Sequence, residues 1–169
     1  MKCTHVRLVF VLVAMMMLIW SDSYSLELDE HLQFLGPFLG KEWVGGFVGE
    51  DAPDLEISLL FEAILDGKVV RYSREAEEAD FASVTHFYWN PKLAEVSFIS
   101  LNNRGIVEEG TVTGDGDAVV LHGSSYRLDM TVEFKTALTL DAEGTLKDSF
   151  LRKEGEEWIQ GHTQKFTVR

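Results

Sequence analysis

The strongest constraint in this sequence is a two-residue alternation of apolar and polar side chains that runs from Trp43 to the end of the chain. Turn-forming residues interrupt the alternation about every 8 to 12 residues, which is typical of short strands joined by tight turns. Successive side chains of a strand point to opposite faces, so this period predicts strands with one buried face. About ten strands are predicted, at Trp43–Val48, Glu56–Leu65, Lys68–Glu75, Ala82–Asn90, Ala94–Leu101, Ile106–Thr113, Ala118–Ser124, Arg127–Leu140, Thr145–Lys153 and Glu157–Arg169.

The junctions between these strands contain residues that favour hairpin turns, such as Asp66-Gly67 and Asn90-Pro91-Lys92. None of the loops is long enough for a crossover helix, so the strands are expected to be antiparallel. A meander of this kind has two edge strands, and pairing the first strand with the last removes both edges. We therefore predict an all-β fold, an antiparallel up-and-down meander closed into a barrel. Two stacked sheets with a packed core are the alternative.

One segment before the strands has a helical pattern. Asp29 is a good N-cap residue, Leu32 and Leu35 lie on one face, and Gly36-Pro37 interrupts the pattern. The sequence predicts one short helix within Asp29–Leu39, followed by a tight turn.

The first 25 residues have the features of a secretory signal peptide. Lys2 and Arg7 precede an apolar run over residues 8–20, and Ser23 and Ser25 supply small residues before the expected cleavage site. The apolar run is shorter than the roughly 18 to 20 residues needed to cross a bilayer, so a retained anchor is the lesser alternative. We expect a signal peptide over residues 1–25, a single domain over residues 26–169, and a secreted or periplasmic location.

The charge balance limits the possible partners. The chain has 28 acidic and 15 basic residues, for a net charge of −13. Removing the leader takes away two basic residues and one acidic residue, and the charge becomes −14. Phosphate backbones and anionic lipid surfaces are repelled by such a chain, so neither nucleic acid nor a membrane is an expected partner. The only cysteine, Cys3, lies in the leader, so the domain cannot rely on disulfides.

Three segments resemble calycin-type barrels. The stretch from Leu32 to Gly46 is similar to the entry of such barrels, in which a short helix closes one end and a Gly…Trp pair opens the first strand. Phe61–Lys68, and Glu109-Gly110-Thr111 followed by Gly114-Asp115, resemble hairpins of a family of uncharacterised secreted lipocalin-like bacterial proteins. The resemblance implies a calycin-like barrel with room for a small apolar ligand.

A second resemblance suggests a different ligand. Trp43-Val44-Gly45 is similar to the opening of nitrobindin-like haem barrels, whose proximal histidine lies on the last strand. His162 occupies a comparable place. This resemblance implies haem as an alternative cofactor, with His162 as the axial ligand.

The last predicted strand contains the most informative polar residues. Alternation places these side chains on one face: Trp158, Gln160, His162, Gln164, Phe166 and Val168. The large aromatics favour this face as the interior, so Gln160, His162 and Gln164 would point inward. Buried polar groups need partners, so they form a hydrogen-bonded core network, meet water at one end of the barrel, or recognise a ligand.

Arg152 on the preceding strand is a second candidate ligand-binding residue. It shares a face with Asp148 and Phe150, and an inward arginine can bind a carboxylate through two hydrogen bonds. Alternatively, Arg152 pairs with Asp148 or stacks on Trp43 at the end of the barrel.

Motifs for catalysis and metal binding are absent from the sequence. The histidines lie on different predicted strands without zinc-site spacing, and the acidic stretches lack the spacing of a calcium loop. Gly123-Ser124 is not part of a nucleophile elbow. We therefore expect an exported, non-catalytic barrel that binds a small apolar or amphiphilic ligand through Trp158, Gln160, His162, Gln164 and Arg152, without a resident metal or cofactor. A haem barrel, a solid structural or interaction module and an enzyme are the alternatives.

Overall fold

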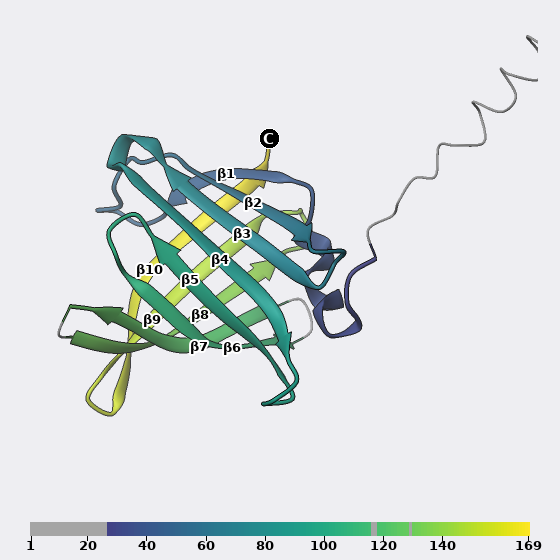
Figure 1. The fold of residues 1–169 in the computed structure, drawn as a ribbon. Coiled ribbons are helices and arrows are strands. Elements are labelled where there is room, and N and C mark those ends of the chain that lie inside the picture. The colour runs from purple at the N-terminus through teal and green to yellow at the C-terminus, as the bar shows by residue number, and fades with distance from the viewer. Residues whose placement is uncertain (1–26, 116–117, 129) are drawn as a thin grey trace, which may run out of the picture.

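A computed structural model describes residues 27–115, 118–128 and 130–169, and the expected signal peptide lies outside these residues. Ten antiparallel strands form a closed barrel in which each strand pairs with its sequence neighbours and β1 pairs with β10 (Figure 1). This confirms the predicted all-β meander and excludes two stacked sheets. The strands are β1 (Glu42–Phe47), β2 (Ile57–Ile64), β3 (Val69–Ala76), β4 (Phe81–Asn90), β5 (Glu95–Asn102), β6 (Val107–Asp115), β7 (Ala118–Arg127), β8 (Met130–Leu140), β9 (Leu146–Glu154) and β10 (Glu157–Val168).

Closure of the barrel depends on a close approach of β1 to β10. Trp43 lies opposite Val168, and Gly45 lies opposite Phe166. A Cβ atom at Gly45 would lie 2.8 Å from the Cα of Phe166, closer than side chains can pack. Glycine at this position therefore lets the first and last strands pair.

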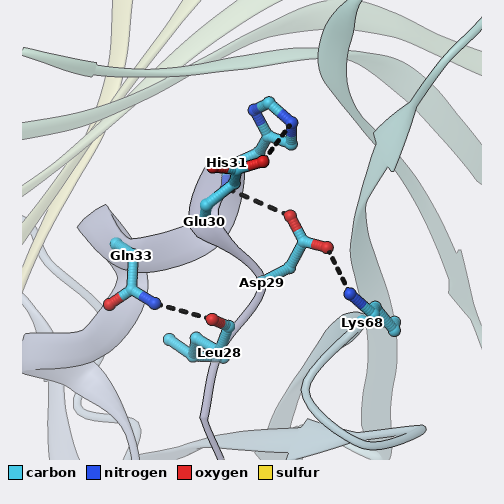
Figure 2. Close-up of polar contacts among 6 residues, drawn as sticks. All are labelled: Leu28, Asp29, Glu30, His31, Gln33 and Lys68. Atoms are coloured by element: carbon cyan, nitrogen blue, oxygen red, sulfur yellow. Dashed lines mark hydrogen bonds and ion pairs between the residues drawn. The ribbon is translucent and has the colours of Figure 1, made fainter.

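A short helix, η1 (Glu30–Phe38), closes one end of the barrel. It is a 3-10 helix, and Asp29 caps it by accepting a hydrogen bond from the His31 N–H at 3.1 Å (Figure 2). Lys68 of the β2–β3 turn donates to Asp29 at 2.9 Å, which ties the cap to the barrel. The hydrogen bond from Lys68 holds the pKa of the Asp29 carboxyl below its ordinary value. Within the described residues, no helix combines the length and apolar character needed to cross a membrane.

Buried and partly buried aromatic rings line the inside of the barrel in a continuous series. The centroids of successive rings lie between 4.4 and 6.5 Å apart. The series is Phe38, Phe61, Tyr72, Phe87, Phe98, Phe134, Phe150, His162 and Phe47. It begins at the end closed by η1 and ends beside the β1–β2 loop, so its last members lie near the opposite end of the barrel.

The last strand contains a β-bulge that changes which side chains face the interior. Gln160 lies opposite Leu151, whereas Thr163 lies opposite Ser149, so β10 contains one residue more than β9 over this stretch. An extra residue shifts the alternation by one position. The two halves of β10 therefore present opposite sets of residues to the interior.

Candidate functional site

A cavity of about 450 Å³ occupies the half of the barrel away from η1. Its apolar wall contains Phe47, Leu55, Ile57, Phe81, Leu138 and Phe150. Arg104 and Arg127 also line the cavity and are exposed, so the cavity is open at this end. Its volume is within the range of small-molecule sites, and its combination of an apolar wall with a few polar groups is typical of them.

Arg74 of β3 is the central polar residue of the cavity. Its Nη2 donates to Oε1 of Gln164 on β10, and its Nη1 lies 3.4 Å from Oδ2 of Asp148 on β9. Gln164 is completely buried and Asp148 almost so, whereas the Arg74 side chain keeps 18% of its surface accessible. Asp148 and Gln164 thus hold the guanidinium, and Arg74 keeps part of its surface accessible in the cavity lining.

Three buried polar atoms beside Arg74 have no hydrogen-bond partner among the described residues. They are Oη of Tyr72, Oδ1 of Asp148 and Nε2 of Gln164. Burial raises the pKa of the Asp148 carboxyl, and the Arg74 charge only partly opposes this effect. Burial also raises the pKa of Tyr72 to about 12, so its hydroxyl keeps its proton and can donate. Leaving such atoms unpaired costs about 1–3 kcal/mol each, so this cluster is not optimised for stability alone.

Positively charged side chains outnumber negatively charged ones in the cavity lining, although the net charge of the whole protein is negative. Among the described residues, the charged side chains that line it are Arg74, Arg104, Arg127, Glu108 and Asp148. Burial raises the pKa of Glu108, and the Ser125 hydroxyl and the charges of Arg74 and Arg127 partly oppose this. The cavity therefore combines three arginines with two carboxyls that both resist ionisation, in a protein of net charge −13.

His162 lines the same cavity from β10. Its ring stacks on Phe150 with a centroid distance of 4.9 Å and an interplanar angle of 5°, and it forms a T-shaped pair with Phe47 at a centroid distance of 5.4 Å. Burial, helped by the charge of Arg74, lowers the pKa of His162 to about 4. The imidazole is therefore neutral at ordinary pH, which lets one ring nitrogen accept a hydrogen bond or coordinate a metal.

The structure separates the candidate residues of the last strand. His162 and Gln164 point inward as predicted, but Trp158 and Gln160 lie on the other side of the bulge and face outward. The Trp158 ring contacts the ammonium groups of Lys135 at 4.2 Å and Lys153 at 5.8 Å on the outer surface. Gln160 is exposed and donates to the carbonyls of Phe150 and His162. The expectation of a single inward face thus fails because the bulge shifts the alternation.

Arg152 lies opposite buried Phe134 of β8, on the face that the alternation predicts, but outside the cavity lining. Its side chain is 50% exposed, and its Nε donates to Oε1 of Glu154 at 2.6 Å. The buried partner of Asp148 is Arg74, from a strand on the other side of the barrel. The sequence reasoning missed Arg74, although its alternation with Val70 and Tyr72 places all three on one face of β3.

No family model and no curated protein matches the sequence. Among solved structures, the chain is similar to the crystal structure of Rv2717c from M. tuberculosis. The TM-score is 0.57 and the identity 16%, over 85% of this chain and 99% of that one. At this identity the likeness concerns the fold alone, which is a closed ten-stranded barrel of general calycin-like form. Within the described residues, no three metal-ligating side chains are grouped together.

Proposed function

We propose that this protein is a non-catalytic barrel that binds a small amphiphilic molecule in its cavity. The observation that supports the proposal best is the combination of about 450 Å³ of space, an apolar wall and the Arg74 cluster. The apolar part of the ligand would lie along Ile57, Phe81 and Phe150, and its polar end would reach Arg74. The cavity also argues against a barrel filled entirely by its own side chains.

The proposal replaces part of the binding set expected from the sequence. His162 remains in the cavity lining, with Arg74 and Tyr72, and Gln164 remains as the buried acceptor that holds Arg74. Trp158, Gln160 and Arg152 lie outside the cavity lining. A ligand that supplies hydrogen bonds to this cluster would offset the cost of its unpaired atoms. Apolar burial along the wall would supply most of the remaining affinity.

Binding can be tested with N-phenyl-1-naphthylamine, a neutral apolar dye whose fluorescence rises in apolar surroundings. Thr136 of β8 lines the cavity, whereas Thr139 lies on the outer face opposite exposed Lys147, so T136F and T139F form a matched pair. We expect saturable binding by the wild type and by T139F, and a Kd at least about tenfold higher for T136F, whose ring fills the cavity. Absence of saturable binding, or equal binding by both variants, would overturn the proposal.

Haem is a second candidate ligand, favoured by one observation. His162 lines the cavity with a neutral imidazole, the form that ligates iron. If haem binds, it would supply an iron centre, and His162 would hold it, with Arg74 and Arg127 close enough to the cavity to meet its acid groups. A haem titration separates the two candidates. A Soret shift that disappears in H162A supports haem, and no shift, or one that persists in H162A, removes it.

We further propose that the domain acts outside the cytoplasm. The support is the signal-like pattern of residues 1–25. Expression of the full chain in a secreting host, followed by intact-mass measurement of the exported product, tests this proposal. Export of a chain that begins at Leu26 supports it, and retention of the full-length chain inside the cell contradicts it.

A further inference from the structure

The ion pair between Arg74 and Asp148 is long and leaves one carboxyl oxygen unpaired among the described residues, so a ligand could replace Asp148 in it. The distance of 3.4 Å is long for a charge-assisted hydrogen bond, which normally spans about 2.7–2.9 Å. Oδ1 of the same carboxyl has no partner among the described residues. Asp148 is therefore held loosely, although it is almost completely buried.

Two carboxylates beside one buried arginine repel each other, and this repulsion favours protonation of one of them. An acid entering from the open end would reach Arg74 more easily than Asp148, because the Arg74 side chain is 18% exposed and the Asp148 side chain 3%. Of the two carboxyls, that of the ligand and that of Asp148, protonation is more favourable at Asp148. It is almost completely buried, which disfavours its charged form, and as an acid its O–H can donate to a neighbouring acceptor.

We propose that the ligand is an amphiphilic monocarboxylic acid whose carboxylate replaces Asp148 as the partner of Arg74, while Asp148 takes up one proton from solvent. This inference rests on the proposed function and specifies its ligand class. The binding step takes up one ligand anion and one proton from solvent. In the complex, Arg74 pairs with the ligand carboxylate and Asp148 is neutral. No bond other than the O–H of Asp148 is formed.

Other titratable and charged groups surround this exchange and must be separated from it. Arg74 and Tyr72 face Asp148 from β3, and His162 lies on β10 beside the same cavity. Glu108 and Arg127 line the cavity from β6 and β7. Of these, Glu108 is the other carboxyl that could take up a proton, so E108Q is the matched control for D148N.

The test is calorimetric titration of the mature chain with decanoate, in several buffers that differ in ionisation enthalpy, from about pH 5.5 to 8.5. The dependence of the heat on the buffer gives the number of protons taken up per decanoate. Near pH 8.5, we expect the wild type and E108Q to take up close to one proton per decanoate bound. D148N should take up about none. Decanoate affinity in the wild type should then fall by up to about tenfold per pH unit, and this decline should disappear in D148N.

Decanol serves as the neutral comparison. Decanol that binds as tightly as decanoate, or decanoate that binds without proton uptake in the wild type, would overturn the inference and leave the proposed function standing. Uptake that persists in D148N would also overturn it. If neither compound nor the neutral dye binds, the proposed function itself fails. The buffer series on the wild type keeps the test decisive even if a variant does not fold.

Discussion

Arg74 of β3 and Asp148 of β9 meet inside the barrel across 74 positions of sequence, with Nη1 and Oδ2 3.4 Å apart. The two strands are not neighbours in the sheet, so the contact crosses the interior. It combines a nearly buried carboxyl with an arginine that keeps access to the cavity. A change at Arg74 should therefore alter both the free energy of unfolding and ligand binding in the cavity.

The first prediction concerns the stability of this pair. R74M leaves Asp148 buried without its cation, and we expect a loss of about 3 kcal/mol in the free energy of unfolding, measured by urea denaturation. R71M is the matched control, because Arg71 lies on the same strand but pairs with Glu62 at the partly exposed surface, and we expect a loss below about 1 kcal/mol. In a double-mutant cycle with D148N, strict additivity would show that the pair does not interact.

The second prediction tests the orientation of the two halves of β10 and of its neighbour. Trp158 lies outside the barrel between Lys135 and Lys153, whereas Phe150 lines the cavity. We expect W158A to leave the Kd of N-phenyl-1-naphthylamine within about twofold of the wild type, and F150A to change it by at least about fivefold. If W158A changes the Kd strongly and F150A leaves it unchanged, the outward position of Trp158 is contradicted.

The fold could be predicted from the sequence because its determinants are local. Alternation identified all ten strands, and turn residues such as Asp66-Gly67 marked where one strand ends and the next begins. Gly67 has a φ of +77° in the β2–β3 turn, a conformation that glycine adopts without strain. The helix differs in type: Pro37 lies inside a 3-10 helix and does not mark its end.

The site was predictable only in part, because one residue changes the phase of the last strand. His162 lies within the bulge and Gln164 follows it, and both point inward, whereas Trp158 and Gln160 precede it. Gly161 within an otherwise regular strand was the available signal, since an isolated glycine in a strand often marks a bulge. Arg74 could not be paired with Asp148 from sequence, because that contact depends on how the closed barrel brings distant strands together.

The third prediction concerns the docking of η1 on the barrel. A Cβ at Gly114 would lie 2.8 Å from Cβ of Phe34, so G114A should push the helix away from β6. We expect a loss of about 1–3 kcal/mol in the free energy of unfolding, as is usual for overpacking. Because the nearest obstacles are Cβ and Cγ of Phe34, F34G removes both atoms, and G114A should cost less in the F34G background than in the wild type. If G114A lowers the free energy of unfolding equally in the wild-type and F34G backgrounds, contact with Phe34 is not the cause of the loss.

The fourth prediction follows from the buried imidazole of His162. Its pKa is about 4 in the folded protein, below the ordinary value of 6.5 that applies to the unfolded chain. Between these two values the unfolded chain binds a proton that the folded chain does not, so acidification through this window favours unfolding. Asp148 acts in the opposite direction, because its raised pKa makes the folded protein bind a proton at higher pH than the unfolded chain does.

The two contributions can be separated by comparing variants. The Tm of the wild type relative to H162Q should fall as the pH decreases from about 6.5 to 4, because only the wild type carries the histidine that resists protonation. The same difference should appear in the D148N background, where the opposing effect of Asp148 is removed. A wild-type Tm that rises relative to H162Q on acidification would mean that the folded protein stabilises the imidazolium, which contradicts a neutral His162 against Phe150.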